Sequence, residues 1–337
     1  MIVFKRIFVL FSTVLLLAAC ASTESKKTTF DSELYDGESV DTLTGEEPPL
    51  TEIEAIQRGD SALEIKNYDL ALYEYIRSLS FTDAKFQDRS LHTIGEIHQR
   101  RGNFALAEKS FLKALEFNPD SVNTLENVGI IYSKKGLISE GRSYLFRAIN
   151  VDQVRLDNKY IIDRYELISE PDVAALNIDG ESPEKSYMGL GVLADIDAQH
   201  DIAKRFYEKA LEINPRSTQT MINLGYSHYM SGNYHIAKRL MNSALQFEPN
   251  NERALNNLAL THLALNETTK ALNVFMRQMD AAEALNNIGY FLILHGKPEQ
   301  AVAYLEQAID KKSSYYPVAN ENLNRALADI RAKSTAQ

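Results

Sequence analysis

The sequence predicts an all-α solenoid of about seven helix pairs, which follows a disordered N-terminal tether and ends in a capping helix. Three observations lead to this fold class. Small residues recur at intervals close to 34 after residue 50, apolar residues recur around them at helical spacing, and a turn glycine or a closing proline punctuates many of the blocks. A period of this length indicates stacked helix pairs, because one pair cannot bury its own apolar faces.

The recurring small residues mark equivalent places in seven units. They are Gly59, Gly95, Gly129, Gly191, Gly225, Ala259 and Gly289, separated by 36, 34, 62, 34, 34 and 30 residues. A small residue at this place lets the two helices of a unit cross closely, while large residues fill the space around the crossing. We therefore predict units 1 to 3 over residues 51–153 and units 4 to 7 over residues 183–315.

The second and fifth units show the full pattern at positions 4, 7, 8, 15, 17, 20, 24, 27 and 32 of the repeat. The second has Leu91, Ile94, Gly95, Gly102, Phe104, Ala107, Phe111, Ala114 and Pro119; the fifth has Met221, Leu224, Gly225, Gly232, Tyr234, Ala237, Met241, Ala244 and Pro249. This pattern resembles the tetratricopeptide repeat over most of residues 52–315. The resemblance implies a right-handed superhelix in which the first helix of each pair lines a concave, protein-binding face.

Two departures from the period predict local changes. The interval from Gly129 to Gly191 contains an insertion at residues 154–182, for which we predict a helix over 160–168 and a loop through Pro171 and Gly180. The insertion is either a hinge or a packed element, and the sequence does not choose between them. The sixth unit is four residues short, so its second helix should be clipped. Within residues 316–337, Pro317 should open the capping helix, which would run to about Lys333 with one polar face.

The N-terminus predicts a signal peptide over residues 1–19. Lys5 and Arg6 precede an apolar run that would form about 16 Å of helix, too short for a bilayer core of about 30 Å. The run ends in Leu-Ala-Ala-Cys20, which resembles the lipobox of bacterial lipoproteins and implies lipidation of Cys20, the one cysteine of the chain. Ala21 implies, by the same resemblance, the periplasmic face of the outer membrane. An ordinary secretory signal cut after Ala19 or Ala21 is the alternative.

Residues 20–50 predict a flexible acidic linker. Ser, Thr, Asp, Glu and Gly dominate this stretch, which ends in Pro48 and Pro49. Thirty such residues reach about 30 Å, enough to hold the folded body clear of a lipid surface. The alternative is that Phe30, Leu34 and Tyr35 form a docking segment.

Charge and motifs exclude several function classes. The formal charge is -10, and removal of the signal peptide leaves 34 basic against 46 acidic residues, so we expect no nucleic-acid partner. The sequence has no Gly-rich phosphate loop, nucleophile elbow or paired cysteines, which favours a protein that is not an enzyme and needs no cofactor. His98, His228 and His262 occupy a packing position, about 10 Å apart in successive units, so we interpret them as core residues and not as metal ligands.

A partner-binding groove is predicted on the first helices of the units. An asparagine recurs at position 6, where its amide can pair with the backbone of an extended peptide. The four residues are Asn127, Asn223, Asn257 and Asn287. Large apolar residues at neighbouring positions concentrate in the C-terminal units and predict an interface there. They are Ile222, Tyr226, Tyr229, Leu260, Leu263, Tyr290 and Ile293.

The combination of lipobox, acidic linker and repeat array resembles the TadD-type lipoprotein of tight-adherence (Flp) pilus assembly. That resemblance implies a scaffold that binds a protein partner, a secretin or pilus assembly component, while its lipid holds it on the membrane. Two alternatives remain at this point. One is a pilotin of the type IVa kind, and the other is an envelope adaptor that recruits peptidoglycan hydrolases or proteases.

Overall fold

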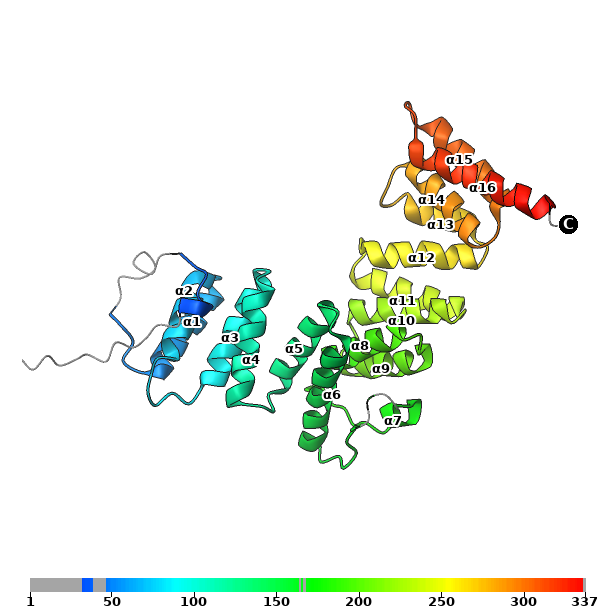
Figure 1. Ribbon diagram of the computed structural model, residues 1–337. Helices are drawn as coiled ribbons and strands as arrows, with labels where there is room; N and C mark the ends of the chain where they lie inside the picture. The colour runs from blue at the N-terminus through cyan, green and yellow to red at the C-terminus, as the bar shows by residue number, and fades with distance from the viewer. Residues whose placement is uncertain (1–31, 39–46, 164, 166–167, 336–337) are drawn as a thin grey trace, which may run out of the picture. The chain divides into compact units, whose positions relative to one another are not determined.

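The computed structural model describes residues 32–38, 47–163, 165 and 168–335. All regular structure in these ranges is helical, and the helices follow one another in pairs (Figure 1), so the predicted all-α repeat solenoid is confirmed. The predicted signal peptide and Cys20 lie outside the described residues. Over the ranges that are described, we find no helix with the length and apolar character needed to cross a membrane.

The chain divides into two compact units after Phe117. The N-terminal unit contains a 3-10 turn and two helix pairs. These are η1 (Ser32–Leu34), α1 (Glu52–Glu64), α2 (Tyr68–Ser78), α3 (Gln87–Arg100) and α4 (Phe104–Phe117). The C-terminal unit contains the remaining repeats, the insertion and the last helix.

The helices of the C-terminal unit begin with the third repeat. They are α5 (Val122–Lys134), α6 (Ile138–Arg155), α7 (Glu170–Ala174), α8 (Glu184–Ile196), α9 (His200–Ile213), α10 (Thr218–Met230), α11 (Tyr234–Phe247), α12 (Glu252–Ala264), α13 (Thr268–Phe275), α14 (Ala281–Leu294), α15 (Pro298–Lys311) and α16 (Pro317–Thr335). The first helix of each pair packs on the second helix of the preceding pair, as α10 does on α9 and α12 on α11.

Each helix pair closes through the small residue that the period revealed. A Cβ atom added to Gly95 would lie 2.6 Å from the ring of Phe111, and one added to Gly191 would lie 2.5 Å from the ring of Tyr207. In both pairs the large residue follows the glycine by 16 positions. The absence of a Cβ therefore creates the space that the buried ring fills.

The turn between paired helices uses the left-handed backbone region. Gly102, Gly136, Gly232 and Gly296 have φ between 70° and 81°, and the equivalent Lys66, Ala198 and Asn266 have φ of 59° or 60°. Glycine adopts this conformation readily, whereas another residue pays about 1–2 kcal/mol. The turn geometry is thus imposed by the packing of the helices even where the sequence lacks glycine.

The insertion is a packed element, and the predicted helix over 160–168 is wrong. Residues 160–163 have no helical structure, and the helix of the insertion is the short α7. The reason lies in α6, which continues to Arg155 and holds the insertion through side-chain amides. Asn150 donates to the carbonyl of Ile162 at 2.7 Å and accepts from its N–H at 3.0 Å; Gln153 pairs in the same way with Asn177 at 2.8 Å.

The third and fourth repeats stack directly in spite of the insertion. Helix α8 packs on α5 and α6, while α7 packs on α9. Across this joint, the buried carboxylate of Glu126 accepts hydrogen bonds from the Ser186 N–H at 2.8 Å and hydroxyl at 3.1 Å. Burial raises the pKa of Glu126, against the opposing influence of Lys185 and of these bonds. The insertion thus lies on the second helices, away from the first helices that carry the predicted groove.

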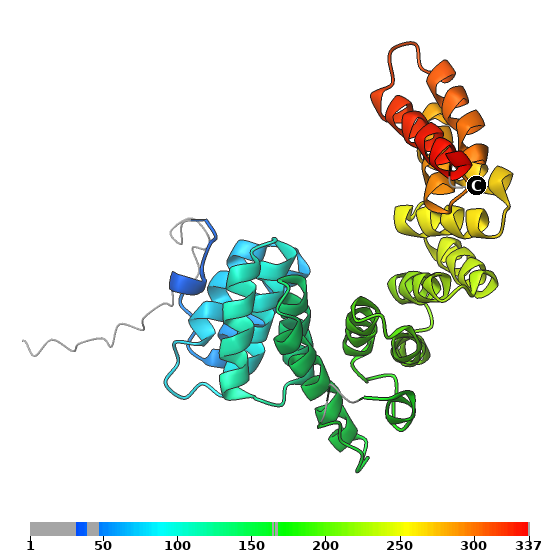
Figure 2. The same ribbon diagram turned by 45° about the vertical axis from the view of Figure 1, so that its right-hand side comes forward.

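Both predictions for the end of the array are confirmed. Helix α13 has 8 residues, whereas the second helices α9, α11 and α15 each have 14, so the sixth unit is clipped as its short period requires. Helix α16 begins at Pro317 and packs on α14 and α15 (Figure 2). Its Glu321, Asn324 and Arg325 are exposed, which suits a helix that ends the stack.

Candidate protein-binding surface

The first helices of the C-terminal unit form the inner side of its curve. Helices α8, α10, α12 and α14 contact one another in succession, and they approach more closely than the second helices α9, α11, α13 and α15 do. Side-chain caps fix where two of these helices begin. The Asn251 side chain accepts from the Ala254 N–H at 3.0 Å, and the Asp280 side chain accepts from the Glu283 N–H at 2.9 Å.

Four of the predicted groove residues present apolar surface on this inner side. Tyr226 is 41% exposed, and Tyr229, Leu260 and Tyr290 are each partly exposed. They come from α10, α12 and α14, which are successive first helices. We call these four residues the groove surface. An apolar surface that is contributed by several repeats and left open is typical of an interface.

The aromatic side chains of the groove surface are held by neighbouring rings. Tyr226 stacks with Tyr229 at 6.3 Å between centroids, and Tyr229 packs on Tyr234 at 5.6 Å. Tyr290 meets Phe291 edge to face at 5.3 Å. Rings that are fixed in this way lose little conformational entropy when a partner covers them, which favours binding.

One contact of the groove surface spans two repeats. The Tyr229 hydroxyl lies 3.3 Å from Nε2 of His295, which follows α14. Burial, together with Lys297, lowers the pKa of His295, and burial raises the pKa of Tyr229. Both shifts keep the pair uncharged near neutral pH. The sequence did not reveal this contact, because it depends on the curvature that brings α10 toward α14.

Three other predicted groove residues belong to the core. Ile222, Leu263 and Ile293 are buried, with 1%, 2% and 5% exposure. Ile222 packs among Met241 and Leu258, while Leu263 and Ile293 pack in one cluster with Phe275. They support the groove surface from below and offer a partner little area of their own.

The four asparagines are not presented equally. Asn127 and Asn223 are buried, whereas Asn257 and Asn287 are partly exposed. Asn223 Oδ1 accepts from Arg253 at 2.9 Å, and Asn287 Nδ2 lies 3.2 Å from the Met279 sulfur. Asn257 and Asn287 are therefore the two whose amides a bound backbone could reach.

Three residues that the sequence analysis did not select extend the surface. Arg253 opens α12 at position 2 of its repeat and is exposed, which places a cation beside the apolar residues. Met230 and Leu294 end α10 and α14, and each is 50% exposed. Position 2 is a groove position in this type of repeat, so the repeat numbering could have identified Arg253. The two helix-end residues required the structure.

The three histidines at the packing position have different surroundings. His98 is fully buried, His262 is 8% exposed and bonds Glu267 at 2.6 Å, and His228 is partly buried, with a pKa lowered by burial. Among the residues that can be described, no three His, Cys, Asp or Glu side chains gather in a way that could hold a metal ion.

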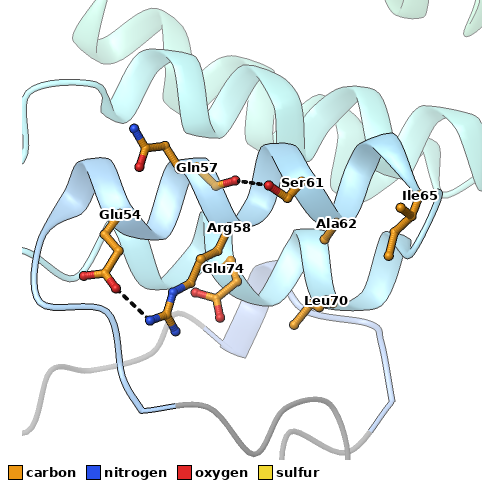
Figure 3. Close-up of a pocket in the computed structure, with 8 residues that line it drawn as sticks. All are labelled: Glu54, Gln57, Arg58, Ser61, Ala62, Ile65, Leu70 and Glu74. Carbon is orange, nitrogen blue, oxygen red and sulfur yellow. Dashed lines mark hydrogen bonds and ion pairs between the residues drawn. The ribbon is translucent and has the colours of Figure 1, made fainter.

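The N-terminal unit has an open pocket on its first helix pair (Figure 3), with a volume of about 470 Å³. It is lined by Glu54, Gln57, Arg58, Ser61, Ala62, Ile65, Leu70 and Glu74. Its charges are satisfied locally: Arg58 bonds Glu54 at 2.7 Å, and Glu74 pairs with Arg77 at 3.4 Å. The pocket adjoins α1, the helix that has no earlier repeat to pack on.

Comparison with known families agrees with the packing. The tetratricopeptide-repeat model matches residues 88–121 and 184–217, and a second tetratricopeptide-repeat model matches residues 281–312. The chain is a tetratricopeptide-repeat protein. These ranges cover the second, fourth and seventh repeats, and the remaining repeats share the same helix pairing in the structure.

Several solved structures share the fold of this tetratricopeptide-repeat protein. A tetratricopeptide repeat protein from Parabacteroides merdae is 16% identical with a TM-score of 0.50, covering 82% of this chain and 98% of its own. PilW, described as a widely conserved type IV pilus biogenesis factor, is 15% identical with a TM-score of 0.51, covering 68% and 93%. PilF of Pseudomonas aeruginosa is 16% identical with a TM-score of 0.51, covering 67% and 89%. No curated protein matches the sequence.

Proposed function

We propose that this protein is an outer-membrane-anchored lipoprotein that binds protein partners through its groove surface and assists the assembly or targeting of a pilus or secretion secretin of the tight-adherence type. The observation that carries the proposal is the groove surface itself. Its partly exposed aromatic residues lie beside the amides of Asn257 and Asn287 and the cation of Arg253. Aromatic groups with a polar rim are the usual composition of a protein interface.

The position of the insertion supports this use of the groove surface. The insertion is held on α6 and α9, both second helices, and leaves α10, α12 and α14 uncovered. A segment of a partner can therefore lie along three consecutive first helices. The partner's backbone would meet Asn257 and Asn287, while its apolar side chains would pack between Tyr226, Leu260 and Tyr290.

The pilus assignment rests on the arrangement of the whole chain. A lipobox, an acidic linker and a repeat array occur together here, as they do in the lipoproteins it resembles. The likeness to PilW and PilF is a likeness of fold, and it also favours a second candidate, a pilotin of the type IVa kind. The insertion and the additional repeats of this chain favour the tight-adherence type over that candidate.

Deletion of the protein from its own cell should prevent its secretin from forming heat-resistant multimers, while secretin monomer is still made. The measurement is immunoblotting of envelope fractions without prior heating, with a complemented strain as the control. Normal multimers together with altered cell-wall turnover would replace the proposal with the envelope adaptor that recruits hydrolases or proteases.

Substitution Cys20→Ser should move the protein from the membrane fraction to the soluble periplasm. Acyl chains contribute about 0.8 kcal/mol per buried methylene, so two or three chains give an anchor that a soluble body cannot replace. The measurement is fractionation with a salt wash, followed by immunoblotting. Continued membrane association of the variant after the wash would reject lipidation as the main attachment.

A further inference from the structure

A short segment from the predicted linker is docked on the N-terminal unit. Residues 32–38 lie against α2, α3 and α4 (Figure 2), so the docking alternative describes this part of residues 20–50. The segment forms only a three-residue 3-10 turn, Ser32–Leu34, and is otherwise irregular. Its contacts are those of an extended peptide on a helical surface, which is a recognised mode of protein binding.

Leu34 is the anchor of this segment. Its side chain is fully buried in the core cluster of the first two repeats, among Leu72, Ile76 and Ile94. The carbonyl of Leu34 lies 2.9 Å from Nε2 of the buried His98. His98 therefore has a role beyond packing, because it marks the floor of a leucine pocket and bonds the backbone of the residue that fills it.

Charged and polar contacts surround the anchor with one consistent polarity. Glu33 pairs with Lys109, and Asp36 accepts from Arg101 at 3.1 Å and from Asn103. The helices donate in each of these contacts, and the segment accepts. Arg101 is oriented by a second bond, at 2.5 Å, to Asp69 of α2. The rim of the pocket is thus complementary to an acidic peptide.

An aromatic contact completes the arrangement. The ring of Tyr35 meets Tyr73 of α2 edge to face at 6.5 Å, and the Tyr35 hydroxyl donates to the carbonyl of Glu38 at 2.7 Å. One buried apolar anchor, one aromatic contact and flanking ion pairs are the components that give short peptides their affinity.

We propose that the Leu34 pocket is a second protein-binding site, occupied in this chain by its own residues 33–36, and that it takes a partner segment of the same chemistry. That segment carries a leucine followed by an aromatic residue, with a carboxylate before and after the two. The rim of Lys109, Arg101 and Asn103 selects the carboxylates, and the pocket above His98 selects the leucine.

The chain's own segment makes this site conditional. A ligand that belongs to the same chain competes at an effective concentration on the order of millimolar when its linker is short. A partner segment therefore binds weakly until the internal segment is displaced or pulled away. This site lies in the N-terminal unit and is separate from the groove surface, so it can bind a different partner.

The test uses a fluorescent peptide of residues 31–38 and measures its anisotropy on the full chain. The chain is compared with two variants that weaken the internal segment, Leu34→Ser and Glu33→Ala with Asp36→Ala. The second variant leaves the core intact, which guards against loss of folding in the first. We expect the peptide to bind the variants at least about 10-fold more tightly than the unchanged chain, because the competing ligand is gone.

Two matched controls define the site. A peptide with leucine replaced by serine should not bind, and adding Lys109→Glu to the Glu33→Ala, Asp36→Ala chain should weaken binding at least about 10-fold. Lack of binding at millimolar peptide, with helicity retained, would show that the segment is only a structural part of the unit. Equal binding to all chains would place the peptide elsewhere. Dimers that form in the unchanged chain and are dissolved by the peptide would identify a second copy as the occupant. Any of these three results overturns the proposal.

Discussion

Substitution Phe146→Ala should lower the free energy of unfolding of the C-terminal unit by about 3–5 kcal/mol, the cost of removing a large aromatic side chain from a packed core. Phe146 is 1% exposed, its ring stacks on Tyr165 of the insertion at 4.5 Å, and it meets Phe206 of α9 edge to face at 6.1 Å. One ring therefore joins the third repeat, the insertion and the fourth repeat. Urea unfolding followed by circular dichroism measures the loss.

Phe247→Ala is the matched control, because Phe247 is a phenylalanine of the same unit with 48% exposure. Its removal should change stability by no more than about 0.5 kcal/mol. A loss below about 1 kcal/mol for Phe146→Ala would contradict the packed insertion and return the hinge to consideration.

Replacing Tyr226, Leu260 and Tyr290 together with serine should weaken partner binding at least about 100-fold while the helices remain folded. Buried aromatic residues at an interface contribute about 2 kcal/mol or more each, and their loss removes most of the groove surface. Folding is preserved because all three side chains are partly exposed in the free protein. Binding of the purified secretin by calorimetry and helicity by circular dichroism give the two measurements.

The control for this variant changes exposed apolar residues on second helices. Phe247 ends α11 and Met276 follows α13, with 48% and 49% exposure. Their replacement with serine removes apolar surface of a similar kind away from the groove surface and should leave affinity unchanged. Unchanged affinity of the triple variant would show that the groove surface is not the binding site.

The repeat architecture was predictable because it depends on size alone. Gly95 and Phe111, or Gly191 and Tyr207, face each other in the structure at the spacing that the period gave. The short sixth unit likewise required a short α13. Such features follow from which side chains fit between two helices, and the sequence states them directly.

The insertion and the linker were predicted less well, because long-range contacts decide their structure. The apolar spacing of residues 160–168 suggested a helix, but hydrogen bonds from Asn150 hold the backbone of Ile162 in another conformation. Leu34 lies in a sequence with the composition of a spacer, yet a pocket built by distant helices buries it. Local periodicity contains neither partner.

The groove surface was predicted in part for the same reason. Repeat position identified Tyr226, Tyr229, Leu260 and Tyr290, which the structure leaves partly exposed. It also selected Ile222, Leu263 and Ile293, which the curvature of the array buries. The contact between Tyr229 and His295 has the same origin. The curvature depends on how successive pairs stack, so the sequence of one repeat cannot give it.

The central claim is that the groove surface binds a component of a pilus or secretion machine, and affinity capture from the native envelope tests it most directly. The detergent-solubilised protein and its Tyr226, Leu260 and Tyr290 serine variant are captured in parallel, and the retained proteins are identified by mass spectrometry. We predict that a secretin or pilus assembly subunit is retained by the unchanged protein and lost from the variant. Retention of cell-wall hydrolases or proteases in its place, or equal retention of the secretin by both proteins, would contradict the claim.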